Sequence, residues 1–222
     1  MPADHSNPER RKFVVGAGAA LSALLLPFGG TANAASSAPG AEPDEPWLKG
    51  LTGKHRQFFD IGAGRNGVPL ERILNFYEAY KESYAVDARD LNVLFGFHGA
   101  GSAYVLNDAM YAKYALGKKY ETTDPLTKAT ATRNPFVRML PGYTWRGDYS
   151  IEAFQARGGR ILWCNKSLGN LSRDLAKDTG GSEADIAAEL RKNVLPGITI
   201  VPAMVVASNR AQEAGCAYSC IA

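Results

Sequence analysis

The feature that most constrains this chain is a series of short apolar runs that lack polar alternation and that are separated by segments of helical periodicity. Leu91–Phe97 (LNVLFGF) is the clearest run, and Arg160–Cys164 and Ile198–Val201 are shorter ones. Such runs are typical of strands that are buried on both faces of a parallel sheet. Strands that alternate with helices specify right-handed βαβ units. The sequence therefore predicts an α/β fold, a three-layer α/β/α arrangement around a mainly parallel sheet of about five strands.

The remaining elements follow from periodicity, capping and turn residues. A first strand is predicted at 54–61 and a last one at 217–221. Helices are predicted at 70–84 with Pro69 at the first helical position, at 102–116 with Gly117 ending it, and at 150–156, 167–177, 182–193 and 204–214. A loop at 118–147, with three prolines and little periodicity, is long for a compact domain, and such loops are usually functional or flexible.

The N-terminus has the pattern of a secretory signal. Positions 10–13 read RRKF, an apolar stretch covers about 14–28, and Ala32-Asn33-Ala34 supplies the small residues of a cleavage site. The paired arginines resemble the twin-arginine export signal, although Glu9 stands where that motif usually has Ser or Thr. A membrane helix would need ~20 apolar residues, and this stretch is shorter and interrupted. We expect a signal at 1–34, a flexible leader at 35–46, a domain at 47–222 and a periplasmic or otherwise exported protein.

Charge and cysteine content narrow the class of protein. Of 25 basic and 22 acidic residues, the predicted signal removes three and two, which leaves a nearly balanced mature chain. That balance, without a basic stripe, predicts no nucleic-acid partner, and signal cleavage leaves no membrane span. Three cysteines are too few for a disulfide scaffold. No metal-ligand spacing is recognisable, so we predict no metal and no cofactor.

Gly62, Gly64 and Gly67 form a G-x-G-x-x-G sequence between a predicted strand and a predicted helix, which is the setting of a dinucleotide fingerprint. The acidic residue that would hold the ribose about 20 positions further on is missing from the end of the second strand. A tight turn between strand and helix is the alternative interpretation. A nicotinamide-dependent oxidoreductase therefore ranks third among the possible functions.

The part of the chain from about 90 to 222 resembles the DsrE/DsrF-like family of small sulfur-handling proteins. The matching segments are GGRILWCN at 158–165, LPGITIVPA at 195–203, QEAGCAY at 212–218 and the pair His98-Gly99. The resemblance implies a flavodoxin-like topology, homo-oligomers that are commonly trimers or hexamers, and a sulfur donor or acceptor protein as partner. It also implies that Cys164 carries sulfur as a persulfide. The loop at 118–147, an added acidic helix after Cys164, and Cys220 depart from the family pattern.

Cys164 is predicted at the carboxyl end of a parallel strand, the edge at which open α/β sheets bind ligands. A helix that begins near Ser167 would present free N–H groups and a positive dipole end, which stabilise a thiolate, and Lys166 could add to this. The alternative is that Cys164 packs as a small apolar residue. Asn165 and Ser167 would either cap the helix or touch a ligand.

His98 is predicted at the same edge on another strand, where it could accept a proton near the sulfur or serve as a hydrogen-bonded structural residue. Cys216 and Cys220 would lie ~13 Å apart if extended, so a disulfide between them requires a bend. The aromatic and arginine residues of the loop at 118–147 would form a lid, an arm to a neighbouring subunit, or internal packing. The alternative to sulfur chemistry is a non-enzymatic oligomeric module that binds a small ligand or a partner.

Overall fold

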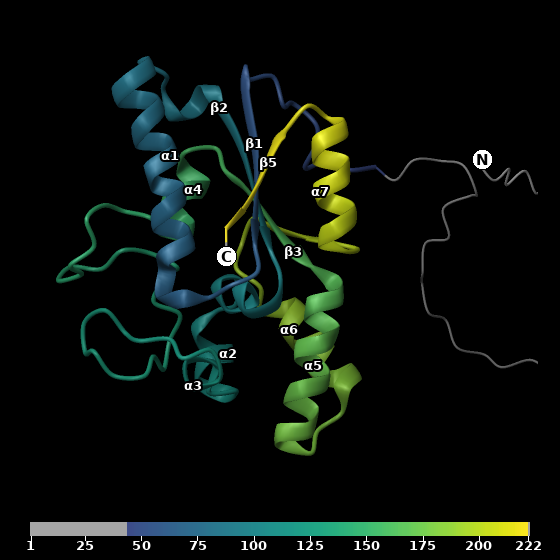
Figure 1. The fold of residues 1–222 in the computed structure, drawn as a ribbon. Helices are drawn as coiled ribbons and strands as arrows, with labels where there is room; N and C mark the ends of the chain where they lie inside the picture. Colours follow the sequence, from purple (N-terminus) through teal and green to yellow (C-terminus); the bar gives the residue numbers. More distant parts are fainter. Residues whose placement is uncertain (1–43, 222) are drawn as a thin grey trace, which may run out of the picture. The chain divides into compact units, whose positions relative to one another are not determined.

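The computed structural model describes residues 44–221, so the predicted signal and most of the predicted leader lie outside the described residues. Five strands form one sheet with the order β4-β3-β2-β1-β5, and all neighbouring strands are parallel. Helices cover both faces (Figure 1), so the prediction of a three-layer α/β/α fold with a five-stranded parallel sheet is confirmed.

The strands are β1 His55–Ile61, β2 Leu91–Phe97, β3 Arg160–Cys164, β4 Ile198–Val201 and β5 Ala217–Ile221. The helices are α1 Val68–Tyr84, α2 Asp108–Lys113, α3 Leu116–Lys119, α4 Ile151–Ala156, α5 Asn165–Thr179, α6 Glu183–Lys192 and α7 Met204–Glu213.

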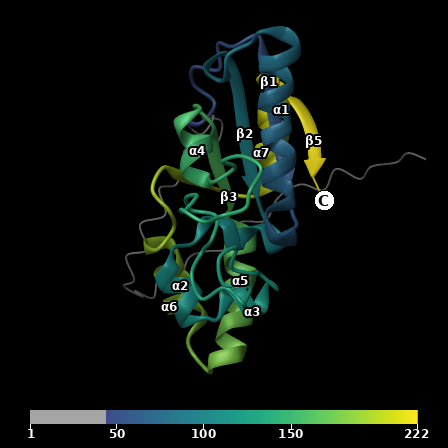
Figure 2. The same cartoon turned by 90° about the vertical axis from the view of Figure 1, so that its left-hand side faces the viewer.

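The strand order explains which helix covers which face. From β1 to β4 the chain steps across the sheet in one direction, and right-handed crossovers keep α1 and α4 on one face. From β4 it returns across the whole sheet to β5, and this reversal puts α7 on the other face (Figure 1). Figure 2 looks onto the α1 and α4 side and shows α2, α3, α5 and α6 gathered beyond the carboxyl ends of the strands.

The order differs from the flavodoxin-like order 2-1-3-4-5, so that detail of the prediction was wrong. Here β1 lies between β2 and β5, and the direction of travel reverses only once, before the last strand. Sequence periodicity reports that strands are parallel, but it does not report the order in which they pair.

Alternate strand residues build two separate apolar cores. Phe59, Phe95 and Trp163 belong to the core on the α1 face. Phe58, Leu162 and Cys164 belong to a smaller core on the opposite face, here called the α7 face, with Met204, Ala207 and Ala211 of α7. Trp47 and Leu51 join this smaller core, so the segment before β1 is part of the packed domain.

The helix predicted at 102–116 is broken in the structure. Residues Gly99–Val105 form a 3-10 helix, and Leu106 then leaves helical geometry to make an isolated antiparallel bridge with Val194. The Asn107 side chain accepts a hydrogen bond from Met110 N and begins α2, and Gly117 lies inside α3 instead of ending a helix. Apolar spacing alone did not reveal this interruption, because it depends on a partner strand segment that is 88 residues away.

The loop at 118–147 packs on its own domain. Stacked rings of Phe136, Trp145 and Tyr149 form its centre. Arg146 pairs with Glu71 and Glu78 of α1, at 2.9 and 2.6 Å. Of the three roles considered for this loop, internal packing is the one that its contacts support.

Candidate functional site

Cys164 ends β3 on the α7 face and is the residue from which α5 begins. Its side chain is 4 % exposed and belongs to the smaller core with Val201 and Met204. Its Sγ accepts a hydrogen bond from the backbone N–H of Met204, the first residue of α7, at 3.3 Å. Cys164 is also the N-cap residue of α5, but its side chain makes no capping hydrogen bond there, so the N–H that contacts the sulfur comes from the N-terminus of α7. Free N–H groups at helix N-termini stabilise negative charge.

His98 follows β2 and is held by residues of the two strands beyond it. Its Nε2 lies 2.8 Å from Oδ1 of Asp60 on β1. Tyr218 on β5 donates a hydrogen bond to the other oxygen of this carboxylate, Oδ2, at 2.7 Å. The ring of Tyr218 stacks on Phe58, with 6.3 Å between centroids. Three adjacent strands thus supply a linked Tyr218–Asp60–His98 unit on the α7 face.

The contacts within this unit shift the pKa values of Asp60 and Tyr218. Burial pushes the pKa of Asp60 upward, but the interactions with His98 and Tyr218 outweigh it, so the pKa lies below its ordinary value. Asp60 Oδ1 is buried, and its close contact with His98 Nε2 does not have regular hydrogen-bond geometry. The hydrogen bond to Asp60 raises the pKa of Tyr218. Asp60 is therefore ionised near neutral pH, and Tyr218 keeps its proton.

Register places the two predicted catalytic residues side by side on the backbone but not in contact. Phe97 and Trp163 are paired across β2 and β3, and His98 and Cys164 are the next residues along each strand. The imidazole lies toward β1, against Asp60 and above Gly62, whereas the sulfur faces α7. The interaction of His98 that the structure describes is with Asp60, a residue that sequence reasoning had not selected.

The three supporting candidates lie in the first turn of α5, because that helix begins two residues earlier than predicted. Asn165 accepts a hydrogen bond from Arg191, and Ser167 Oγ accepts one from Gly99 N at 3.1 Å. Lys166 is exposed. None of the three side chains caps the helix, since Cys164 occupies the cap position without a side-chain hydrogen bond.

All three cysteines of the described chain are free thiols. Cys216 is buried, which raises its pKa, and Cys220 is exposed on the edge strand β5. Cys220 is paired with Asp60 across β5 and β1. The chain is extended from Ala217, so the bend that a bridge between Cys216 and Cys220 would need does not form.

The glycine-rich turn serves local packing. A Cβ at Gly62 would lie 2.9 Å from Cε1 of His98, so this glycine makes room for the imidazole. Gly67 has φ of +85° and faces the ring of Phe136, where a Cβ would lie 2.5 Å from Cε1. The first and third glycines of the G-x-G-x-x-G sequence are thus explained by a side chain of the protein itself.

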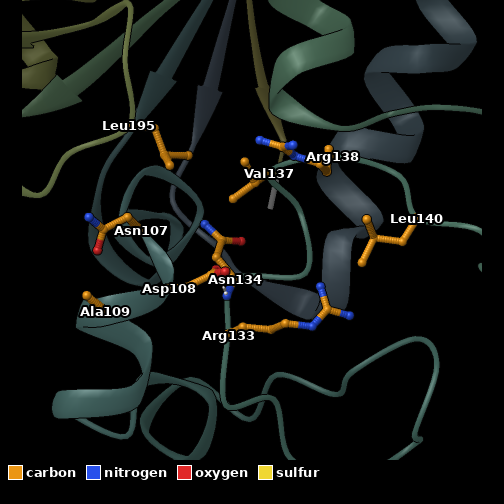
Figure 3. A pocket seen from close by; sticks show the side chains of 9 residues that line it. All are labelled: Asn107, Asp108, Ala109, Arg133, Asn134, Val137, Arg138, Leu140 and Leu195. Atoms are coloured by element: carbon orange, nitrogen blue, oxygen red, sulfur yellow. Dashed lines mark hydrogen bonds between the residues drawn. The ribbon is translucent and has the colours of Figure 1, made fainter.

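A cavity lies away from this site, between the loop at 118–147, α2 and Leu195. It has a volume of about 530 Å³. Figure 3 shows Val137, Leu140 and Leu195 around it, with Arg138 at the top of the view and Arg133 at the bottom. Arg133 pairs with Asp124 at 2.9 Å and Arg138 with Glu152 at 2.8 Å. The cavity wall is therefore mixed, and its two arginines already have acidic partners.

Within residues 44–221, no group of His, Cys, Asp and Glu side chains could hold a metal ion. The helices of the same residues include none that is long and apolar enough to cross a membrane. No model of a known protein family matches the sequence, and no curated protein matches it either. Fold and site together define a parallel three-layer α/β protein with a thiol and an Asp–His pair at the carboxyl edge of its sheet.

Proposed function

We propose that this protein carries out thiol chemistry as a sulfur carrier, with Cys164 accepting a sulfane sulfur as a persulfide and passing it on. One observation carries the proposal: the Sγ of Cys164 accepts a backbone N–H from the start of α7 while α5 begins at the same residue. An N–H at a helix N-terminus that points at a sulfur favours the thiolate, which is the nucleophilic form of cysteine. The resemblance of 90–222 to DsrE/DsrF-like proteins agrees with this chemistry.

Access to the sulfur is the condition that this function must meet. Cys164 is 4 % exposed, and the first turn of α7 lies over it. Val205 in this turn is 79 % exposed and Val206 is also exposed, so these two side chains contribute little to holding the turn in place. A shift of the first turn of α7 would open the sulfur to a donor, because helix ends open more readily than sheet cores.

The test is mass spectrometry of the native protein after treatment with glutathione persulfide. We expect a gain of about 32 Da, one sulfur atom, on the peptide that contains Cys164. Cys164→Ser must lose this adduct, and any adduct on the exposed Cys220 is scored separately as a control for general thiol reactivity. A folded protein that gains sulfur only at Cys220 would refute the assignment to Cys164.

The burial of Cys164 favours a second candidate, a non-enzymatic oligomeric module that binds a small ligand or a partner. In that case Cys164 packs as a small apolar residue, and Cys164→Ala leaves ligand retention unchanged. Alkylation with iodoacetamide separates the two functions. A thiol that reacts in the native protein supports sulfur chemistry, whereas a thiol that reacts only after unfolding supports the binding module.

Location and assembly complete the proposal. We propose export by the twin-arginine route, which the RRKF sequence at 10–13 supports. We also propose homo-oligomers, trimers or hexamers, and a protein that donates or accepts sulfur as partner. Tyr218, Val205 and Val206 are large apolar side chains exposed on β5 and α7, and such residues are enriched where proteins associate. Sedimentation velocity of the exported protein tests the oligomeric state directly.

A further inference from the structure

In the Tyr218–Asp60–His98 unit each side chain is held in place by a neighbour, and the sulfur-carrier proposal does not use this arrangement. His98 is fixed from below by Gly62, where any Cβ would meet the ring, and from the side by the carboxylate of Asp60. Asp60 is in turn fixed by the phenol of Tyr218, which comes from the far end of the sequence. The side chains of His98 and Asp60 are 35 % and 17 % exposed, so the imidazole reaches solvent while the carboxylate behind it is largely covered.

We infer that His98 is the general acid of sulfur transfer, donating a proton to the thiolate that leaves the sulfur donor, and that Asp60 and Tyr218 are the positioning residues that hold it. This inference rests on the proposed function of Cys164. It also changes the role expected for His98, since a proton acceptor for Cys164 would have to face the sulfur, and the imidazole faces Asp60 instead.

The chemistry balances without an oxidant or a metal. The Cys164 thiolate attacks the outer sulfur of a persulfide R–S–SH, a new S–S bond forms, and the S–S bond of the donor breaks. The electron pair of that bond leaves with R–S⁻, which takes the proton from the His98 imidazolium and departs as R–SH. Cys164 ends as a persulfide and His98 ends neutral. Return of a proton from solvent to the imidazole, which pairs with ionised Asp60, resets the site.

The strand spacing brings His98 close to a donor on Cys164, although the imidazole contacts Asp60 and not the sulfur. Neighbouring strands lie ~4.8 Å apart, and His98 and Cys164 are adjacent positions on neighbouring strands of the α7 face. The two sulfur atoms of a donor are only ~2 Å apart. In an in-line displacement the departing sulfur lies ~4 Å from the Cys164 sulfur, two S–S bond lengths away, which is close to the spacing between the two strands.

A leaving-group comparison tests the acid role. Glutathione disulfide and 5,5′-dithiobis(2-nitrobenzoate) are both attacked by a thiolate, but only glutathione thiolate is basic enough to need a proton as it leaves. We expect His98→Gln to slow modification of Cys164 by glutathione disulfide about 100-fold. Asp60→Asn and Tyr218→Phe should each slow it on the order of ten-fold. All three should leave the rate with the aryl disulfide nearly unchanged, and Tyr84→Phe, at an exposed tyrosine of α1, serves as matched control.

The rates are followed on the Cys164 peptide by mass spectrometry, so that Cys216 and Cys220 do not contribute. Equal slowing with both disulfides would mean that the variants disturb Cys164 itself, and it would overturn the acid role. Unchanged rates with both reagents would overturn it as well. A wild-type protein whose Cys164 reacts with neither reagent refutes the proposed function together with the acid role.

A second measurement does not depend on Cys164 reacting at all. In protein labelled with ¹³C at aspartate carboxyl carbons, the titration of Asp60 reports its hydrogen bonds directly. Tyr218→Phe and His98→Gln should each raise the pKa of Asp60, because each removes an interaction that lowers it. Tyr84→Phe should not. An Asp60 titration that is the same in Tyr218→Phe as in the wild type would refute the positioning role of Tyr218, whatever Cys164 does.

Discussion

Gly96, in the central strand β2, is the position at which one methyl group should reveal how tightly α7 is held over the sheet. It faces α7, and a Cβ there would lie 2.5 Å from the Met204 Sδ and 2.6 Å from Cζ of Phe58. Phe58 is fully buried, and Met204 is the residue whose N–H contacts Cys164. Gly96→Ala therefore pushes directly on the turn that covers the sulfur.

The expected size follows from two opposing terms. Overpacking of a tight core costs ~1–3 kcal/mol, and replacing glycine by alanine recovers ~0.4–1 kcal/mol by restricting the unfolded chain. We expect the free energy of unfolding to fall by about 1–2 kcal/mol. Gly169→Ala is the matched control, because nothing lies within 4 Å of its Cβ position in α5. It should raise the free energy of unfolding by ~0.5–1 kcal/mol, the helix preference of alanine over glycine.

Equilibrium unfolding in urea, followed by tryptophan fluorescence, measures both variants against the wild type. Unchanged slopes with shifted midpoints would show that stability alone has changed. The same Gly96→Ala protein should be alkylated faster at Cys164, since the first turn of α7 is displaced. A Gly96→Ala protein at least as stable as Gly169→Ala would refute the close approach of α7 to β2 and the packing argument built on it.

Three further predictions concern single side chains. Asn134→Ala should lower the free energy of unfolding by about 2–4 kcal/mol in urea titrations, because the buried amide donates to Leu106 O at 2.7 Å and accepts from Phe136 N at 3.0 Å. Asp60 has a depressed pKa in the folded protein, so its charge stabilises the fold above the ordinary value of ~3.9 and ceases to do so as pH falls below it. The difference in urea midpoint between wild type and Asp60→Asn should therefore be constant above about pH 5 and shrink between about pH 5 and pH 3, and a difference that stays constant to pH 3 would contradict the shift. Gly62→Ala should displace His98 and reproduce the His98→Gln rate with glutathione disulfide while keeping the wild-type rate with the aryl disulfide.

The sequence predicted strands more accurately than helices, and the reason is physical. β2, β3, β4 and β5 begin and end at the predicted residues. A buried strand must be apolar throughout its length, so the boundaries of its apolar run are the boundaries of the strand. The 3-10 segment Gly99–Val105 and the break before α2 depend on Leu106 pairing with Val194, a distant contact that local periodicity does not report. The strand order was predicted wrongly for the same reason, because it depends on contacts between residues that are far apart in the sequence.

The candidate site could be predicted only as far as strand ends can be located. Cys164 and His98 were placed at the carboxyl ends of their strands, and both lie there. The burial of Cys164 follows from the return of α7 across the sheet, which the sequence order of elements does not show. Asp60 is a single acidic residue in a predicted strand, and its partners His98 and Tyr218 are 38 and 158 residues away. Only the register of β1 between β2 and β5 makes these three residues neighbours.

The same turn of α7 both covers Cys164 and donates the N–H that its sulfur accepts, so in the proposed sulfur carrier the protection and the activation of this sulfur depend on one contact. A displacement large enough to admit a donor weakens that hydrogen bond. Substitutions that loosen the turn should therefore increase access at the expense of nucleophilicity. Such a sulfur is suited to a donor that brings its own contacts to the exposed Val205 and Val206, because binding there would move the turn only when the donor is in place. A partner protein can make those contacts and a free small molecule cannot. Under the proposed function we therefore expect a protein persulfide to load Cys164 faster than glutathione persulfide, which reacts only when the turn opens by itself.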